Sequence, residues 1–352
     1  MENEEKTQPS TLNTQHSILL TGGGTGGHLA IVRAVKEALL KRGVRPLYIG
    51  SESGQDRAWF GQDEGFAAKL FLPTRGIVDK RGIGRFAALF QTFRTALKAR
   101  AFMKAHDAGA VLSVGGFSAA PASFAAVAGG VPFFIHEQNA VTGRLNRLLK
   151  PFARRYFSSY EGERIDYPVA DIFFETARTR EKLNTVIFLG GSQGAVAIND
   201  FALTLATKLA EKGVRVLHQA GERDAERVAE VYEKMGVAAE VFAFDAKLHE
   251  KIAAADLAVS RAGASTLWEL AANRLPTLFV PYPYAAGDHQ YHNARYLAER
   301  GAGWVVRQEA LTEAAFWEAA EGDLAAVSKR LAGMIRPGGS DRIAEALCAA
   351  LA

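Results

Sequence analysis

Short apolar runs alternate with amphipathic segments from Ser17 onward. Apolar runs of this length are typical of strands buried on both faces, and apolar residues that recur every three or four positions are typical of helices. The alternation predicts parallel strands joined by helical crossovers, which is the α/β class. The clearest strands are expected at residues 17–21, 45–50, 110–114, 131–136, 185–190, 214–218, 256–260 and 276–281.

This arrangement occurs twice along the chain. The segment ILLTGG at 18–23 is echoed by VIFLGG at 186–191, and GVRPLY at 43–48 is echoed by GVRVLH at 213–218. Two Rossmann-like, doubly wound domains in tandem explain the repeat better than one long sheet. In open parallel sheets ligands bind beyond the carboxyl ends of the strands, so two such domains facing each other predict a cleft between them.

The boundary between the domains is expected near 156–179, where the periodic pattern weakens. We predict a disordered N-terminal extension at 1–15, a first domain at 16–165 and a second domain at 166–339. The last helix, within 340–352, is expected either to dock back on the first domain or to pack elsewhere.

Composition fits a globular protein of two domains. The chain has 352 residues, of which 48% are hydrophobic and 23% are charged. The single cysteine, Cys348, excludes an intramolecular disulfide and fits a reducing compartment. Residues 1–15 lack a basic region followed by an apolar one, so we expect no secretion signal. Glycines and prolines break the uncharged run at 108–135, which therefore predicts buried strands and a short helix rather than a membrane span.

Glycine-rich segments follow the first strand of each predicted domain, as TGGGTGGH at 21–28 and GGSQG at 190–194. Glycines adopt positive φ and let the backbone approach a ligand, and the N–H groups at a helix start favour an anion. Both loops are therefore candidate phosphate sites. His28 adds a side chain that can carry a proton near neutral pH.

The first loop also fits a dinucleotide-binding fingerprint. Gly22, Gly24 and Gly27 satisfy G-x-G-x-x-G, and Glu52 follows the second strand where a ribose-binding acid would lie. An NAD(P)-dependent oxidoreductase is therefore an alternative, although this motif gives no role to His28 or to the second loop.

The second loop also fits the nucleophile motif of serine hydrolases, G-x-S-x-G. Its nucleophile would be Ser192, followed by Asp245 or Asp256 and then by His289. The repeat between the two loops favours phosphate binding over this alternative. A sugar-nucleotide-binding protein without catalysis is a further alternative.

Two later segments carry polar side chains in patterns that suit a ligand. The segment RAGASTLWE at 261–269 is a third transition from strand to helix, where Glu269 has the spacing either to cap its helix or to accept ribose hydroxyls. His289 and His292 could ligate a metal, but no third ligand of evident spacing follows and no metal is expected. These side chains fit hydrogen bonding to a polar ligand better.

The net charge of +4 and the isoelectric point near 9.1 reflect a cluster of cations at 80–104. Apolar side chains in this stretch recur at helical spacing, at Phe86, Leu89, Phe90 and Phe93. Such a face usually packs on a core; if it is exposed, it predicts an interfacial helix that binds an anionic membrane surface. Nothing else in the sequence indicates nucleic acid.

Six motifs in order resemble the MurG family of glycosyltransferases over nearly the whole chain. They are the loop at 22–28, GGF at 115–117, HEQN at 136–139, the loop at 190–194, the segment at 261–269, and HQ at 289–290 followed by NA at 293–294. The resemblance implies a GT-B fold, with the lipid acceptor on the N-terminal domain and UDP-N-acetylglucosamine on the C-terminal domain.

The resemblance also implies the reaction. N-acetylglucosamine passes with inversion from UDP-N-acetylglucosamine to the 4-hydroxyl of undecaprenyl-diphosphate-linked N-acetylmuramyl-pentapeptide, in peptidoglycan synthesis. The enzyme would act as a peripheral protein at the cytoplasmic face of the membrane, with no cofactor and no metal held by the protein. A base must take the hydroxyl proton, and His28 is the candidate because an imidazole suits this work at neutral pH, with Glu137 in reserve.

Further site residues follow from the same resemblance. The UDP-N-acetylglucosamine side is expected to include Asn139, Ser192, Asp245, Ala264, Ser265, Thr266, Glu269, His289 and Gln290. The acceptor diphosphate is expected to contact Thr25, Gly26, Gly27, Gly115, Gly116 and Ser118. The chain departs from the family pattern at Ala170, where the family has an arginine, and at Asp245, where the family has an apolar residue.

Overall fold

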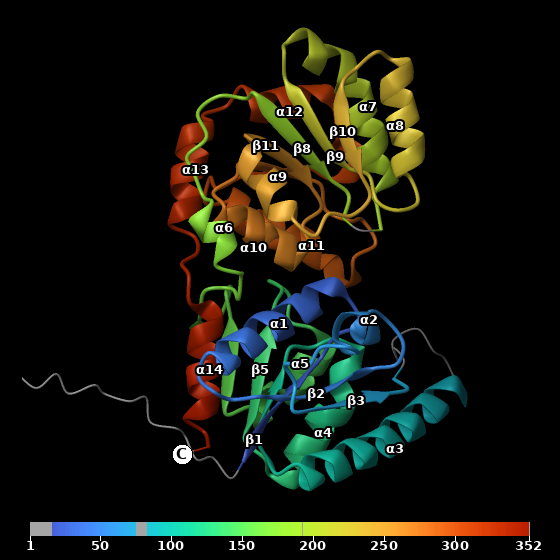
Figure 1. Ribbon diagram of the computed structural model, residues 1–352, viewed down its shortest axis with the longest axis vertical. Helices are drawn as coiled ribbons and strands as arrows, with labels where there is room; N and C mark the ends of the chain where they lie inside the picture. Colours follow the sequence, from blue (N-terminus) through green and yellow to red (C-terminus); the bar gives the residue numbers. More distant parts are fainter. Residues whose placement is uncertain (1–15, 75–82, 192, 352) are drawn as a thin grey trace, which may run out of the picture. The chain divides into compact units, whose positions relative to one another are not determined.

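The computed structural model describes residues 16–74, 83–191 and 193–351, with the side chains of 83–89 and 163 left out. The predicted extension at 1–15 lies outside the described residues. The chain divides into two compact units (Figure 1). The first comprises 1–136, 144–157 and 340–352, and the second comprises 137–143 and 158–339. The domain limits at 165 and 339 remain predictions.

The first unit is built on a seven-stranded sheet in the order β3-β2-β1-β4-β5-β6-β7, and its first five strands pair in parallel. The strands are β1 (Ser17–Thr21), β2 (Leu47–Ser51), β3 (Ala68–Leu72), β4 (Ala108–Ser113), β5 (Phe133–Glu137), β6 (Arg155–Ser158) and β7 (Glu163–Arg164). The helices are α1 (Gly26–Leu40), α2 (Asp56–Phe60), α3 (Ile83–Ala105), α4 (Ala120–Gly129), α5 (Arg144–Leu149) and α14 (Gly339–Cys348), with short 3₁₀ turns at η1 (Phe117–Ala119) and η2 (Lys150–Phe152).

The second unit is built on a six-stranded parallel sheet in the order β10-β9-β8-β11-β12-β13. Its strands are β8 (Thr185–Leu189), β9 (Arg215–Gln219), β10 (Ala239–Phe242), β11 (Leu257–Ser260), β12 (Thr277–Phe279) and β13 (Trp304–Val305). Its helices are α6 (Ile172–Glu175), α7 (Val196–Glu211), α8 (Ala225–Lys234), α9 (Leu248–Ala254), α10 (Ala264–Ala272), α11 (His289–Ala298), α12 (Glu313–Ala320) and α13 (Leu324–Ala332), with 3₁₀ turns at η3 (Ala286–Asp288) and η4 (Gln308–Ala310).

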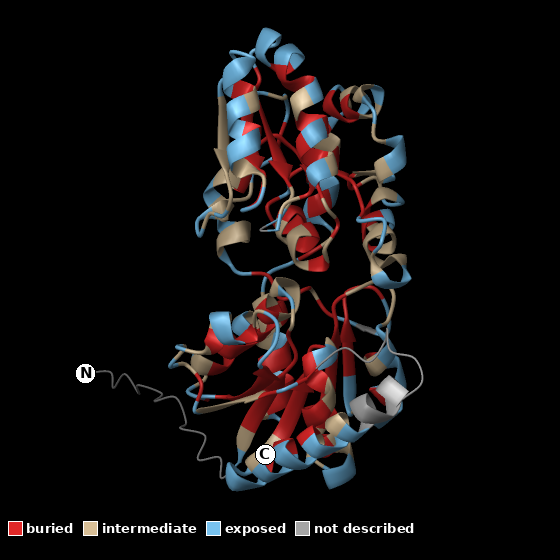
Figure 2. Ribbon diagram, turned by 90° about the vertical axis from the view of Figure 1, so that its right-hand side faces the viewer, coloured by how far each residue is buried: buried red, intermediate tan, exposed pale blue. Residues whose placement is uncertain are grey.

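The two doubly wound sheets confirm the predicted fold class. Each of the eight expected strands is present, with ends that differ by a few residues. The sequence pattern missed β3, β6, β7, β10 and β13. Of these, β3, β10 and β13 are partly exposed along most of their length, whereas the central strands are buried (Figure 2). A partly exposed strand carries no continuous apolar run, which is why its signal was weak.

The uncharged run at 108–135 forms β4, α4 and the start of β5. Most of these residues are buried in the core of the first unit. The run is divided into strands and a helix, as its glycines and prolines predicted. Across the described residues, no helix combines the length and the apolar character needed to cross a membrane.

In each sheet the strand order reverses at one pair of strands whose carboxyl ends are level. Thr21 of β1 lies beside Ser113 of β4, and Leu189 of β8 lies beside Ser260 of β11. The order reverses there because β1 lies between β2 and β4, and β8 lies between β9 and β11. Such switch points are where open parallel sheets bind ligands. Both glycine loops leave from these positions.

The C-terminal helix α14 groups with the first unit. Arg42, just after α1, donates from Nη1 to Asp341 Oδ1 at 2.6 Å. Both side chains are partly exposed, so this pair adds at most about 1 kcal/mol to the attachment. Ile343 and Leu347 are fully buried, and their burial contributes more.

Arg180 is fully buried between two helix ends in the second unit. Its guanidinium donates to Ala255 O at 3.1 Å and to Ile252 O at 3.2 Å, at the end of α9, and to Asn273 at the end of α10. These carbonyls carry partial negative charge, which suits a cation. Burial lowers the pKa of Arg180 to about 9, so the side chain stays charged at neutral pH.

We predict that Arg180→Met lowers the free energy of unfolding by about 3 kcal/mol or more, because several buried carbonyls lose their donor. Urea denaturation measures the change. Arg295→Met is the control, since that side chain is half exposed on α11 and should cost no more than about 0.5 kcal/mol. Equal, small losses in the two variants would contradict the account.

Candidate active site

A buried carboxylate anchors the first glycine loop. Asp56 Oδ2 accepts from Gly24 N at 2.6 Å, while Oδ1 accepts from Tyr48 OH at 3.0 Å and from Ser51 N at 2.9 Å. The Tyr48 hydroxyl also lies 3.0 Å from Gly22 O. Burial, together with the charge of Asp56, raises the pKa of Tyr48, so its hydroxyl remains a donor. Sequence reasoning missed both residues, because neither belongs to a recognisable motif.

The segments at 22–28 and 115–118 form one surface. A Cβ placed on Gly116 would lie 2.4 Å from Gly23 O, and one placed on Gly24 would lie 2.5 Å from the ring of Phe117. Both glycines also have positive φ, so a side chain is excluded twice over. The two loops predicted to hold the acceptor diphosphate are therefore brought together.

His28 faces this surface from the first turn of α1. Its Nδ1 lies 2.9 Å from Thr25 Oγ1. A Cβ placed on Gly115 would lie 3.6 Å from His28 Nε2 and 3.2 Å from Asn146 Nδ2. In the tautomer in which Nδ1–H donates to Thr25 Oγ1, the imidazole lone pair is on Nε2, toward Gly115. Asn146, which is buried, was not predicted from the sequence.

Polar groups suited to an anion gather on this surface. Helix α1 starts at Gly26, and its first turn, which includes Gly27, contains no acidic residue. Thr25 makes no side-chain cap, so its hydroxyl takes none of the N–H groups that lead the helix, and groups of this kind favour an anion. Within the described residues the buried Ser118 hydroxyl has no hydrogen-bond partner. A buried hydroxyl of this kind is suited to a ligand oxygen.

His136 lies at the carboxyl end of β5 and interacts electrostatically with His28. It is fully buried, and burial together with the charge of His28 lowers its pKa to about 3. It therefore stays neutral at physiological pH and adds no positive charge beside His28.

Glu137 organises the segment that follows β5. Its Oε1 accepts from Asn139 N at 3.0 Å, and its Oε2 accepts from Gly143 N at 2.9 Å. Asn293 of α11 holds the same segment, because its Oδ1 accepts from Ala140 N at 2.8 Å and its Nδ2 donates to Asn139 Oδ1 at 3.1 Å. Both carboxylate oxygens of Glu137 thus serve the backbone, which suits a base less well than the His28 geometry does.

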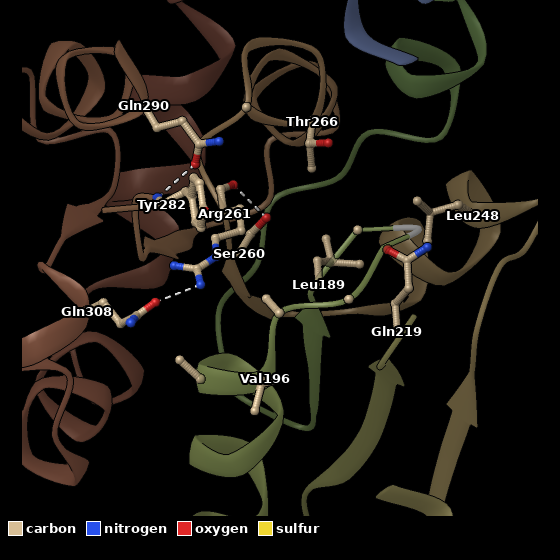
Figure 3. A pocket seen from close by; sticks show the side chains of 16 residues that line it. Leu189, Val196, Gln219, Leu248, Ser260, Arg261, Thr266, Tyr282, Gln290 and Gln308 are labelled. Carbon is tan, nitrogen blue, oxygen red and sulfur yellow. Dashed lines mark hydrogen bonds between the residues drawn. The ribbon is translucent and has the colours of Figure 1, made fainter. Parts of the chain in front are cut away.

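A cavity of about 480 Å³ lies at the switch point of the second sheet (Figure 3). It is lined by the glycine loop, by the ends of β8, β9 and β11, and by the start of α10. Of the residues predicted for the nucleotide sugar, Thr266 and Gln290 line it, whereas Ser192 lies outside the described residues. Polar lining residues that were not predicted are Gln219, Ser260, Arg261, Tyr282 and Gln308.

Gln290 shapes this cavity. Its Oε1 accepts from Tyr282 N at 2.9 Å and from Ala262 N at 3.2 Å, so the amide joins the segments that follow β11 and β12. The same amide presents its NH₂ group as a donor. The pocket wall is thus fixed by a side chain predicted to bind the ligand.

Six predicted residues do not line this cavity: Asn139, Asp245, Ala264, Ser265, Glu269 and His289. Ser265 and Glu269 lie together on α10, with Ser265 Oγ 3.4 Å from Glu269 Oε1. His289 Nδ1 lies 2.9 Å from Ala286 O. Asp245 is partly exposed, and its pKa is lowered by the hydrogen bond from Lys247 N and by the neighbouring Lys251.

Both candidate acids of the hydrolase alternative, Asp256 and Asp245, have other partners. Asp256 precedes β11, at the end of the strand opposite the glycine loop, and its carboxylate accepts from Asn184 N and Thr185 N and pairs with Arg178. Asp245 pairs with Lys251. Among the described residues no group of three or more His, Cys, Asp and Glu side chains could hold a metal.

Three buried polar side chains, those of Asn199, His218 and Tyr232, form a hydrogen-bonded series next to the second glycine loop. Asn199 Nδ2 donates to Ala220 O at 3.0 Å and to Asp224 Oδ2 at 2.7 Å, so its Oδ1 must accept from His218 Nε2 at 3.1 Å. His218 Nδ1 then accepts from Tyr232 OH at 3.1 Å. This arrangement requires neutral His218, and burial lowers its pKa to about 4. A Cβ on Gly194 would lie 2.4 Å from Ala220 O, so the loop packs on the carbonyl that this series fixes.

Comparison with known proteins identifies a family over both units. Residues 18–158 match the profile described as the glycosyltransferase family 28 N-terminal domain, and 185–330 match the glycosyltransferase family 28 C-terminal domain. Proteins from Wolinella succinogenes and Sulfurovum sp. are 52% identical over 331 residues and 49% identical over 333 residues. Each alignment covers 94% of this chain and 98% of the relative. Both relatives are named UDP-N-acetylglucosamine--N-acetylmuramyl-(pentapeptide) pyrophosphoryl-undecaprenol N-acetylglucosamine transferase.

Solved structures agree with this assignment. MurG from Acinetobacter baumannii superposes with a TM-score of 0.78 at 26% identity, covering 94% of this chain and 99% of that one. The calicheamicin glycosyltransferase CalG4 has a TM-score of 0.66 at 16% identity, covering 96% and 98% of the two chains, which shows a shared fold.

We predict that His218 makes stability depend on pH. Its folded pKa of about 4 lies below the unfolded value of 6.5, so the unfolded chain binds more protons between these values. The contribution of neutral His218 to the free energy of unfolding is complete above pH 6.5 and is lost as the pH falls toward 4. Between pH 7 and pH 5 this group should account for about 2 kcal/mol.

Urea denaturation of the wild type and of His218→Gln at pH 7 and pH 5 measures this difference. The glutamine variant does not titrate, so it should lose less stability than the wild type between the two pH values. An identical loss in both proteins would exclude His218 as the source.

Proposed function

This chain belongs to glycosyltransferase family 28, in the group that includes MurG, and we propose that it transfers N-acetylglucosamine from UDP-N-acetylglucosamine to a lipid-linked acceptor. The acceptor is undecaprenyl-diphosphate-linked N-acetylmuramyl-pentapeptide, and the 4-hydroxyl receives the sugar. The observation that carries the proposal is about 50% identity, over nearly the full length of both chains, to relatives named for this transfer.

The reaction is a single displacement. The acceptor oxygen forms a bond to the anomeric carbon as the bond to UDP breaks, so the configuration inverts and no covalent enzyme intermediate forms. His28 takes the hydroxyl proton. Its support is the contact of Nδ1 with Thr25 and the position of Nε2 above Gly115. Glu137 is second choice, because its carboxylate accepts from two backbone N–H groups.

The acceptor diphosphate binds on the surface formed by the first glycine loop and the segment after β4. Its contacts are the backbone of Thr25, Gly26 and Gly27, the loop at Gly115 and Gly116, and the Ser118 hydroxyl. Support comes from the packing of the two loops on each other and from the buried hydroxyl of Ser118.

The donor binds at the switch point of the second sheet. The N–H groups of Ala264, Ser265 and Thr266 at the start of α10 hold the leaving diphosphate, since this turn contains no acidic residue. Ser192 joins them, Glu269 accepts the ribose hydroxyls, and the uracil lies near Asp245. The sugar contacts Asn139, His289 and Gln290. No metal and no further cofactor is needed by this scheme. Ala170 is exposed and short, so it cannot replace the contact of the family arginine.

The protein works as a peripheral enzyme at the cytoplasmic face of the membrane, with α3 on the anionic surface. Phe90, Phe93 and Leu97 of this helix are 62%, 61% and 51% exposed, so they do not pack on the core. Arg94 lies over the ring of Phe90. Exposed apolar side chains among cations favour an interface with anionic lipid. Phe86 and Leu89 were also predicted to contact the membrane, but their side chains are not among those that the structure describes.

Release of UDP tests the proposed transfer. We expect UDP to leave UDP-N-acetylglucosamine only when a lipid-linked muramyl acceptor is present, and at the same rate with a chelator. Release that does not depend on the acceptor, or that stops with the chelator, would contradict the scheme. Binding of NADH or labelling of Ser192 by a fluorophosphonate would favour the oxidoreductase or the hydrolase instead.

We predict that His28→Ala lowers turnover by about 10²- to 10⁴-fold, which is the usual contribution of a general base. Binding of UDP-N-acetylglucosamine should be unchanged. Calorimetry and the UDP-release assay measure the two quantities. The comparison variant is Glu137→Gln, which removes the carboxylate and keeps one of the two oxygens that accept from the loop backbone. Near-normal turnover of His28→Ala together with severe loss in Glu137→Gln would transfer the role of base to Glu137.

We predict that Phe90→Ser with Phe93→Ser weakens binding to vesicles containing anionic phospholipid, because both rings are exposed. Sedimentation with vesicles measures the bound fraction. Phe244→Ser is the control, since Phe244 is 66% exposed but lies in the second unit. Unchanged sedimentation of the double variant would remove α3 from the membrane interface.

A further inference from the structure

Arg261 is held at the wall of the cavity in the second unit (Figure 3). It is the first residue after β11, next to Ser260. Its Nη1 donates to Val280 O at 3.1 Å and to Pro281 O at 3.2 Å, and its Nη2 donates to Gln308 Oε1 at 2.7 Å. The acceptors are two backbone carbonyls and one neutral amide, so these hydrogen bonds fix the guanidinium without neutralising its charge.

No carboxylate lies within ion-pair distance of Arg261 in the described part of the chain. Arg261 is half-buried, so its charge is partly removed from water, and this burial lowers the pKa of the guanidinium. Lys36 differs, because this lysine is buried and pairs with Asp63. A partly buried cation without a counter-ion carries a desolvation cost that an anionic ligand would offset.

The rest of the cavity wall is neutral. Among the described lining residues Arg261 is the one charged side chain, and its neighbours include the backbone of Gly190, Gly191 and Gly194 and the start of α10 at Gly263. Arg261 has five N–H donors and uses three of them within the described chain, so Nε–H and one Nη2–H have capacity for a ligand. A planar guanidinium matches two oxygens of a phosphate group.

We propose that Arg261 binds the diphosphate of the UDP donor and stabilises the charge that develops on UDP as it leaves. The inference rests on the proposed transfer and adds a catalytic residue to it. When the bond between the anomeric carbon and the β-phosphate oxygen breaks, its electron pair passes to that oxygen, and the acceptor oxygen takes its place on carbon. Arg261 meets the growing charge at a fixed position, and no reorganisation is needed at that moment.

The test compares uridine with UDP as ligands of the wild type, Arg261→Met and Arg261→Lys. Calorimetry should show that Arg261→Met loses about 10- to 100-fold in affinity for UDP, because hydrogen bonds to charged groups have this weight. Its affinity for uridine should stay unchanged, which also shows that the variant is folded. Arg261→Lys keeps the charge but not the planar fork, so its loss of UDP affinity should be smaller.

Arg215→Met is the matched control. That arginine is exposed at the amino end of β9, opposite the cavity, and pairs with Glu240. Its loss should leave both affinities unchanged. In the UDP-release assay at saturating donor, Arg261→Met should also turn over more slowly than the wild type, since the charge grows in the transition state.

Several outcomes would overturn the inference. Wild-type affinity of Arg261→Met for UDP would do so, and so would an equal fractional loss for uridine and UDP, which would mark a purely structural role. If the wild type bound neither ligand, the proposed transfer would itself fail, and the inference with it. A wild type that transfers the sugar, beside an Arg261→Met protein with unaltered UDP binding, would reject the role of Arg261 alone.

Discussion

At the switch point of each sheet two parallel strands end level with each other, and this alignment places the loops of both candidate sites. Because Thr21 lies level with Ser113, the loops that follow β1 and β4 start side by side and pack on each other. Leu189 and Ser260 have the same relation in the second sheet, where the loops after β8 and β11 line one cavity. Hydrogen bonds of the ladders fix these positions, so the backbone donors of the loops are placed before any ligand binds.

Both switch points have a glycine loop between a strand and a helix, but they differ in their side chains. The first has an imidazole, His28, beside a wall of glycines and a buried hydroxyl. The second has a guanidinium, Arg261, and no other charged side chain among the described lining residues. The imidazole can take up a proton, which suits an incoming hydroxyl. The guanidinium keeps its positive charge, which suits a leaving diphosphate.

Repetition of apolar runs was enough to predict the central strands of both sheets, since strands buried on two faces carry a strong signal. Single polar residues gave no comparable signal. Asp56 is an ordinary acid in the sequence, and only the fold shows that it holds Gly24. His218 and Asn293 likewise act through partners far along the chain. Helical spacing in α3 could not decide between core and surface, because an apolar face has the same period in both. Among the described side chains of this helix, Phe90 and Phe93 are exposed, whereas Ala99 and Met103 are buried.

The identity of the product decides whether this protein carries out the proposed transfer. Incubation of the protein with UDP-N-acetylglucosamine and the lipid-linked muramyl acceptor, followed by mass spectrometry and NMR, shows where the sugar goes. The account predicts a lipid-linked disaccharide with a β-linkage to the 4-hydroxyl, the inverse of the α-configuration in the donor. Free N-acetylglucosamine in place of the disaccharide, or an α-linkage, would contradict it.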